Sequence, residues 1–345
     1  MTTKRQELAE LGEFGLIERI SQQFYPRNKS SVKGIGDDAA VIDAGTHYQL
    51  VSTDMLLEGI HFDLAYVPLQ HLGYKAIAAN VSDIAAMNGT PQQVVVSLGL
   101  SNRVSLEAVD ALYAGMRAAC DNYQVDLVGG DTSASASGLI ISITVIGAVA
   151  KDKVVYRSGA RPNDILCVTG DLGAAYVGLL VLQREKEVFL SNPAAQPELE
   201  KFEYVVSRQL KPEARMDIIH ELADVQLVPT AMIDVSDGLA SELFHIATQS
   251  KCGIKIFEDK VPIDTETYNV ASLDFKIDPI TCALNGGEDY ELLFTIRQED
   301  LEKVKNHPDI HLIGHLHDQP QQHVLVSKAG HAVPLTAQGW NHFRK

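Results

Sequence analysis

The amino-acid sequence predicts an α/β protein of two domains with mixed α+β layers. The chain has 345 residues, about twice the ~100–200 residues of a common domain. Hydrophobic residues make up 46% and charged residues 21% of it, a composition typical of globular proteins rather than disordered chains. Apolar runs of strand length alternate with segments of helical periodicity in both halves. This alternation is typical of layered α/β folds.

The first half contains two predicted helices and three predicted strands. Apolar residues recur at every third or fourth position in residues 69–87 and 106–123, which favours helices. Residues 94–100, 126–128 and 139–149 are short apolar runs, and we expect them to form strands.

A polar segment at residues 151–164, with Gly159 and Pro162, separates the two halves. Because such segments are typical of domain boundaries, we predict domains at residues 1–152 and 153–345. The second half then alternates again. Strands are predicted at 164–170, 231–235, 254–257 and 291–296, helices after Gly170 and at 213–222, 238–250 and 299–306, and a last extended stretch at 324–335.

The net charge and the spacing of the cysteines argue against several kinds of partner and site. Asp and Glu number 45 against 29 Lys and Arg, a formal net charge of -16. Nucleic acids and anionic membranes bind basic surfaces, so we expect neither as a partner. The four cysteines are far apart without a CxxC motif, which argues against a zinc ribbon or disulfide framework and for a reducing compartment. With no apolar signal core and no run long enough to span a bilayer, we expect a cytoplasmic protein.

The most informative feature is the position of the acidic residues. They occur beside glycine, serine or the end of an apolar run, in clusters at residues 36–38, 52–54, 82–83, 129–131, 234–238 and 286–289. Any one such pair is an ordinary turn. Several of these clusters are expected to close strands, as Asp54 is expected to end an apolar strand at residues 49–54, and open α/β sheets build ligand sites at such ends. Asp83 lies in an otherwise apolar predicted helix, where a carboxylate needs a partner.

Converging carboxylates would require cations. Two unit charges ~4 Å apart repel by about 4 kcal/mol at an effective dielectric of 20. Oxygen ligands without cysteine favour Mg²⁺, with Mn²⁺ as the alternative, over zinc. Mg²⁺ held by a few carboxylates is the usual partner of nucleotide phosphates.

Three features could hold phosphate directly, and each has a structural alternative. The segment 129–138 offers small residues and free backbone N–H groups, or is only a hairpin connection. The segment 234–238 leads into a helix N-terminus, where Ser236 would bind an anion or only cap the helix. Arg157 would clamp a phosphate or only complete the domain boundary.

Other motifs carry no function. Residues 34–39 match GxGxxA, but no apolar strand precedes them and two acids would repel a pyrophosphate. There is no P-loop, protein-kinase or GxSxG motif. Seven of the twelve histidines follow residue 306; Pro308 breaks a helical arrangement of these, so we expect a solvated histidine-rich surface.

Eight motifs together resemble those of the thiamine-monophosphate kinases, in the superfamily of aminoimidazole ribonucleotide synthetase. They are GEFGLI, GIGDDAA, STDMLLEGIHF, KAIAANVSDIAAM, GGDTS, RSGARP, DVSDGLASE and GGEDYELLFT, and with the final Trp340 they span nearly the whole chain. The resemblance implies a two-domain fold, a homodimer formed through the N-terminal domains, and nucleotide bound between acidic loops of the first half and the second half. It implies ATP and thiamine monophosphate as substrates and several Mg²⁺ ions.

The resemblance also implies site residues, motif by motif. The magnesium ligands would be Asp38, Ser52, Thr53, Asp54, Asp83, Asp131, Asp234 and Asp237. The nucleotide contacts would be Gly130, Asp131, Arg157, Ser236 and, on a variable helix, Tyr113. The substrate contacts would be His61, Glu288 and Trp340. Taken alone, His61 is more typical of a packed or surface histidine and Trp340 of a core residue, although an aromatic ring suits a cationic thiazolium.

Two sibling activities are disfavoured. A selenophosphate synthetase needs a reactive Cys or selenocysteine near the N-terminus, but the first 119 residues contain no cysteine. A hydrogenase-maturation protein needs a C-terminal cysteine, but this chain ends NHFRK.

The expected reaction is direct in-line transfer of the ATP γ-phosphoryl group to thiamine monophosphate. The acceptor phosphate has a second pKa near ~6 and is already anionic, so no catalytic general base and no covalent intermediate are expected. The alternatives are another ATP-using member of the superfamily, a regulator that binds the same ligands without turnover, and a metal-dependent phosphohydrolase.

Overall fold

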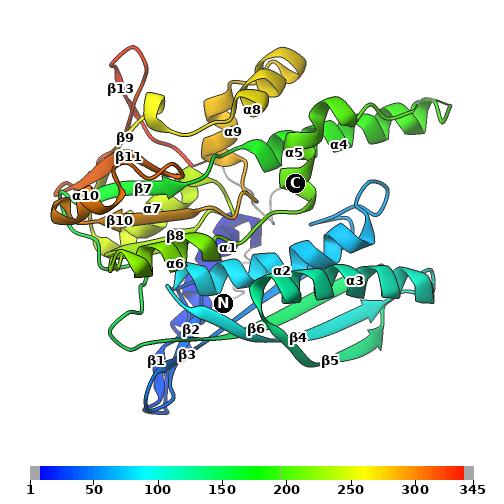
Figure 1. The fold of residues 1–345 in the computed structure, drawn as a ribbon, viewed down its shortest axis with the longest axis horizontal. Coiled ribbons are helices and arrows are strands. Elements are labelled where there is room, and N and C mark those ends of the chain that lie inside the picture. Colours follow the sequence, from blue (N-terminus) through cyan, green and yellow to red (C-terminus); the bar gives the residue numbers. More distant parts are fainter. Residues whose placement is uncertain (1–7, 195, 338–345) are drawn as a thin grey trace, which may run out of the picture.

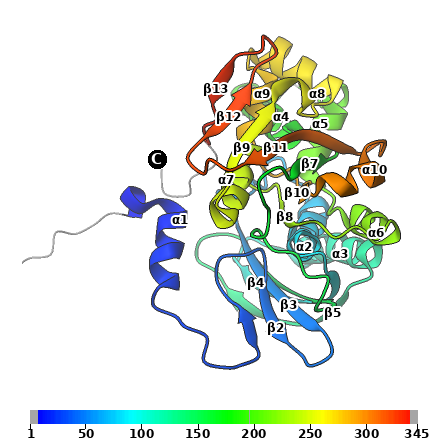
Figure 2. The same ribbon diagram turned by 90° about the vertical axis from the view of Figure 1, so that its left-hand side faces the viewer.

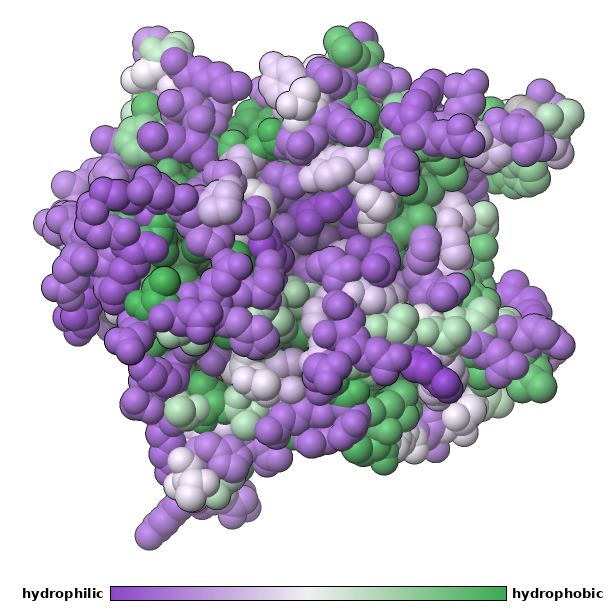
Figure 3. All heavy atoms as spheres, viewed as in Figure 1, coloured by the Kyte–Doolittle hydropathy of each residue, from purple (hydrophilic) through white to green (hydrophobic). Residues whose placement is uncertain are grey.

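A computed structural model describes residues 8–194 and 196–337. Two β-sheets and their helices form two stacked halves (Figures 1 and 2), which confirms the predicted α/β class. Within the described part of the chain, no helix has the length and apolar character needed to cross a membrane. The face seen in Figure 3 is mostly hydrophilic and is hollowed between α4 (Ala174–Ser191) above and α3 (Leu106–Tyr123) below.

The first half is a six-stranded sheet in the order β1-β2-β3-β6-β4-β5. All neighbouring strands are antiparallel except β4 and β5. Besides α3, the elements of this half are α1 (Leu8–Ser21), β1 (Ser31–Lys33), β2 (Ala40–Asp43), β3 (Tyr48–Leu57), α2 (Leu69–Ala86), β4 (Thr90–Leu100), β5 (Asp126–Ala134) and β6 (Ile140–Val149).

Helices α2 and α3 pack together over one face of this sheet (Figure 1). α2 is apolar and alanine-rich and is buried over most of its length. Gly73 permits the close approach of α3, because a Cβ there would lie 2.0 Å from the Leu112 carbonyl oxygen. Side chains of β6 alternate between buried and half-buried, as expected for a strand with one covered face.

The second half is a seven-stranded sheet in the order β13-β12-β9-β11-β7-β10-β8. Its strands are β7 (Ile165–Thr169), β8 (Ala231–Asp234), β9 (Gly253–Phe257), β10 (Leu292–Ile296), β11 (Ile310–His317), β12 (His323–Val326) and β13 (Ala332–Pro334). Its further helices are η1 (Glu200–Phe202), α5 (Glu203–Leu210), α6 (Met216–Asp224), α7 (Leu239–Ser250), η2 (Glu258–Lys260), α8 (Thr265–Asn269), η3 (Val270–Phe275), α9 (Pro279–Asn285), η4 (Gln298–Asp300) and α10 (Leu301–Val304).

The two halves share one hydrophobic core. Buried residues of α2, such as Ile77, belong to the same cluster as Met216 on α6, Met232 on β8 and Phe294 on β10. α2 therefore lies between the first sheet and the second half (Figure 1) and contacts elements of both.

Three local predictions are corrected. The strand expected at 126–128 continues to Ala134, because β5 pairs with β4 along its length. Asp54 lies inside β3 rather than at its end. The helix expected at 299–306 is reduced to the short η4 and α10. The histidine-rich run around His311 is a strand, as its non-helical character indicated, but His311, His315 and His317 are half-buried rather than fully solvated.

Candidate functional site

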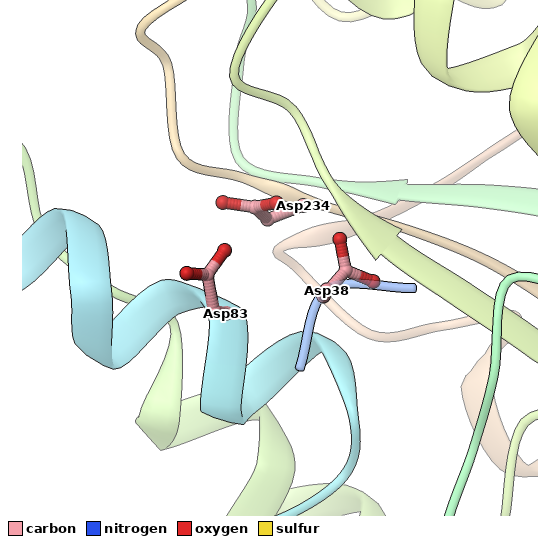
Figure 4. A group of neighbouring side chains, drawn as sticks. All are labelled: Asp38, Asp83 and Asp234. Carbon is pink, nitrogen blue, oxygen red and sulfur yellow. The ribbon is translucent and has the colours of Figure 1, made fainter. Parts of the chain in front are cut away.

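Three aspartates from distant parts of the chain meet in one place. Asp38 lies in the turn before β2, Asp83 on α2, and Asp234 is the last residue of β8. One carboxylate oxygen of each lies within 4.8 Å of the others (Figure 4). Their convergence, which the sequence pattern suggested, brings both halves of the protein into one acidic site.

Burial and mutual repulsion raise the pKa values of these aspartates. Burial raises the pKa of Asp38 to about 7, although the Arg157 guanidinium lowers it, and raises the pKa of Asp234 to about 6. Burial raises the pKa of Asp83 well above its ordinary value, and repulsion from Asp54, Asp234 and Asp38 adds to this. Without a bound cation, it is therefore unfavourable for all three carboxylates to be ionised at once.

Neighbouring side chains orient these carboxylates without neutralising them all. Ser52 Oγ donates to Asp83 Oδ2 at 2.6 Å, and Ser82 Oγ donates to Asp234 Oδ2 at 2.7 Å. Arg157 donates to Asp38 Oδ1 from Nε at 3.1 Å and from Nη2 at 2.6 Å. The other oxygen, Asp38 Oδ2, is buried and has no hydrogen-bond partner among the described residues. An unpartnered buried carboxylate oxygen beside two more carboxylates fits a hard cation with oxygen ligands.

The segment after β8 adds further groups beside the cluster. Helix α7 has Gly238, not Ser236, as its N-cap, so the capping alternative for Ser236 does not apply. The Asp237 backbone N–H donates to Glu242 Oε1 at 3.0 Å, and Glu242 is itself buried. This contact fixes the turn that presents Ser236 and Asp237.

Two of the expected metal ligands do not join the cluster. Thr53 Oγ1 donates to the Ile143 carbonyl oxygen at 3.0 Å and accepts a bond from Thr144 at 3.1 Å. Asp131 is paired with Ser97, an exposed residue between two buried neighbours on β4, so it lies on the sheet face away from α2. Ser52 and Asp54, by contrast, face α2.

The expected nucleotide contacts Gly130 and Tyr113 lie on β5 and α3 of the first half. Gly130 is within β5, and Tyr113 on α3 packs half-buried against the first core. Only residues 135–138 of the serine-rich segment form a loop. With residues 100–103 and Ala134 this loop lines a cavity of about 500 Å³ that contains none of the acidic clusters.

The expected substrate residues lie in two loops. His61 Nδ1 accepts a bond from the Leu57 N–H at 3.0 Å, which places its proton on Nε2. Glu288 has a positive φ of 59° and forms an ion pair with Lys75 at 3.0 Å. The negative charges of Asp63 and Glu288 contribute to the raised pKa of Tyr66, after burial, so the loop after β3 approaches Glu288. Trp340 lies outside the described residues.

Sequence reasoning missed Lys75, Gln209 and Tyr66 as neighbours of Glu288. Gln209 Nε2 donates to Glu288 Oε2 at 2.7 Å. The sequence did contain a signal for Lys75, because a lysine within an apolar predicted helix needs a buried partner. Gln209 and Tyr66 had no signal in the sequence.

Comparison with known families gives matches in both halves. Residues 36–149 match AIR synthase related protein, N-terminal domain, and residues 161–325 match AIR synthase related protein, C-terminal domain. The chain is 36% identical to the thiamine-monophosphate kinase of Bacillus subtilis, covering 97% of this chain and 100% of the relative. It is 35% identical to that of Aquifex aeolicus, covering 97% and 99%.

Solved structures give the same result. A structure described as AaThiL complexed with AMPPCP and TMP matches with a TM-score of 0.82 and 32% identity, covering 99% of this chain and 100% of that one. Hydrogenase maturation protein HypE in complex with ATP matches with a TM-score of 0.67 at 21% identity, covering 92% and 93%. The second likeness shows the shared fold alone.

Proposed function

The chain belongs to the thiamine-monophosphate kinase family of AIR synthase related proteins, and we propose that it phosphorylates thiamine monophosphate to thiamine diphosphate with ATP. The observation that carries this proposal is the meeting of Asp38, Asp83 and Asp234 within 4.8 Å. The similarity to a complex with AMPPCP and TMP supports the choice of ligands.

We propose that several Mg²⁺ ions bind at this acidic site. Asp38, Asp83 and Asp234 would hold them, with Ser52, Asp54 and Asp237 beside them. Thr53 and Asp131, on the other face of the sheet, stay predictions. Bound Mg²⁺ neutralises phosphate charge and aligns the attacking and leaving oxygens of a phosphoryl transfer.

Side chains and backbone groups of the protein position the two phosphate groups. We propose that Arg157, Gly130 and Ser236 contact the nucleotide, and that Tyr113 is a further candidate. A phosphate oxygen of thiamine monophosphate attacks the γ-phosphorus, the bond to the β–γ bridging oxygen breaks, and ADP leaves with the electron pair. The attacking oxygen is anionic at neutral pH, so no side chain has to remove a proton. No phospho-enzyme forms.

An assay with Mg-ATP and thiamine monophosphate tests this function. Purified protein is expected to form ADP and thiamine diphosphate in equal amounts, with inversion at a chiral γ-phosphorus. Binding of both ligands without products would indicate a regulator. Inorganic phosphate in place of thiamine diphosphate would indicate a phosphohydrolase, and inversion replaced by retention would indicate a covalent intermediate.

We propose that the protein acts as a homodimer formed through the first sheet, within an N-terminal domain of residues 1–152 and beside a C-terminal domain of residues 153–345. Met55 on β3 is 54% exposed and Val128 on β5 is 60% exposed, so this sheet leaves apolar side chains available to a partner.

The four cysteines are buried and free, which supports a reducing compartment such as the cytoplasm.

Light scattering after size exclusion tests the homodimer. Val128→Asp is expected to convert a dimer of the wild-type chain to monomer, because a charge in a ~800 Å² dimer interface loses its hydration. Leu273→Asp is the matched control, since Leu273 is 65% exposed on η3 in the second half. A monomeric wild-type chain, or a Val128→Asp variant that stays dimeric, would contradict the proposed interface.

A further inference from the structure

A buried lysine on α2 contacts the loop that carries Glu288. The Lys75 side chain is 6% exposed, and lysine is almost never so buried unless it is paired. Its Nζ lies 3.0 Å from Glu288 Oε1 and donates to the Gln209 carbonyl oxygen at 3.1 Å. Lys75 therefore joins α2 of the first half to two segments of the second half.

Gln209 holds the other oxygen of the Glu288 carboxylate. Its Nε2 donates to Glu288 Oε2 at 2.7 Å, and Gln209 is itself buried near the end of α5. Both Glu288 oxygens are thus held, one by each residue. A carboxylate can accept about four hydrogen bonds, and the Glu288 side chain is 29% exposed. It keeps the capacity to accept bonds from a ligand.

The backbone around Glu288 requires such support. Glu288 and Tyr290 have φ values of 59° and 53°, a left-handed conformation that non-glycine residues rarely adopt and that is strained. The intervening Asp289 is buried and accepts a bond from the Gly173 N–H at 2.8 Å. Strained residues held by surrounding contacts are typical of ligand-binding loops.

The position of Lys75 on α2 also relates this loop to the acidic site. Asp83 follows Lys75 by eight residues on the same helix, a rise of ~12 Å. Helix α2 therefore links the Glu288 loop to the acidic site, and the Glu288 N–H also donates to the carbonyl oxygen of Ser236, two residues after Asp234, at 2.7 Å. A substrate with its phosphate at one end and a nitrogen heterocycle at the other can engage both.

We propose that Lys75 and Gln209 are positioning residues that fix the Glu288 carboxylate for the N–H groups or positive charge of the substrate heterocycle. This inference rests on the proposed kinase function and deepens it. The two residues then set the affinity for thiamine monophosphate, and ATP binding does not depend on them.

Steady-state kinetics of Lys75→Met test the inference. The KM for thiamine monophosphate is expected to rise at least tenfold, while the KM for ATP stays within twofold. Lys75→Arg, which keeps a charged donor, is expected to recover most of the affinity. Lys75→Met combined with Glu288→Gln is expected to be no worse than Glu288→Gln alone, because both changes disable the same contact.

Lys303→Met is the matched control. Lys303 also contacts a carboxylate, Asp300, at 2.8 Å and a backbone carbonyl oxygen, that of Gln226, at 3.1 Å, but it lies on α10. If Lys75→Met shows no thermal unfolding transition and is therefore not folded, Gln209→Met supplies the same test. A folded variant with wild-type KM for thiamine monophosphate, or additive losses in the double variant, overturns the inference. A wild-type protein that makes no thiamine diphosphate overturns the proposed function instead.

Discussion

Asp83→Asn is expected to reduce kcat at least a hundredfold while leaving the fold intact. Burial, and then the charges of three acidic neighbours, raise the pKa of Asp83, so its negative charge opposes folding in the absence of a cation. The same charge is needed to hold the cations that neutralise two polyanionic substrates. Asparagine can still accept the bond from Ser52, so the local packing is retained.

Two measurements check this result. The first is kcat for thiamine diphosphate formation, and the second is the thermal unfolding midpoint in EDTA, expected to stay equal or to rise by ~2 °C or more. Asp110→Asn, at an exposed position on α3, is the matched control and is expected to change neither. An Asp83→Asn variant with wild-type kcat would show that this acid is structural.

Stabilisation by Mg²⁺ is expected to be larger at pH 8 than at pH 5. Asp38 and Asp234 have folded-state pKa values of about 7 and about 6, above their ordinary value. The folded protein therefore binds these protons more tightly than the unfolded chain. Their contribution to stability is full below about pH 4 and is lost as the pH rises through 6 to 7. One pKa unit corresponds to about 1.4 kcal/mol, so the loss is on the order of several kcal/mol.

Urea unfolding at both pH values, in EDTA and in Mg²⁺, measures this effect. Other groups titrate in the same range, and His245, whose pKa burial lowers to about 4, acts in the opposite direction because its contribution is lost as the pH falls. The difference in the free energy of unfolding between the wild type and Asp234→Asn gives the contribution of the acidic site alone. Equal Mg²⁺ stabilisation at both pH values, or no difference for Asp234→Asn, would contradict a cation-dependent cluster.

The fold could be predicted where periodicity was strong. Helices α2 and α3 and strand β6 followed from their apolar spacing. The extension of β5 through GGDTSA could not, because glycine and serine are poor strand formers and the strand depends on its partner. A Cβ at Gly130 would lie 1.9 Å from the Val96 carbonyl oxygen, so pairing with β4 requires glycine at this position. The same glycine lowers the strand propensity by which the segment could have been predicted.

The acidic site could be predicted in part. Asp83 was a candidate because it lies in an apolar helix, and Asp38 and Asp234 because acidic clusters of their kind recur along the chain; the structure brings all three together. The sequence could not reveal that Asp131 faces away from them, since the face of a residue depends on strand register. Nor could it pair Lys75 with Glu288, because tertiary packing alone brings these distant segments into contact.

Anomalous diffraction from crystals grown with Mn²⁺, a non-hydrolysable ATP analogue and thiamine monophosphate would test the acidic site most directly. We predict manganese peaks bound by Asp38, Asp83 and Asp234, with the analogue's terminal phosphates on the same ions. Nucleotide bound with no metal at these three carboxylates would contradict the account.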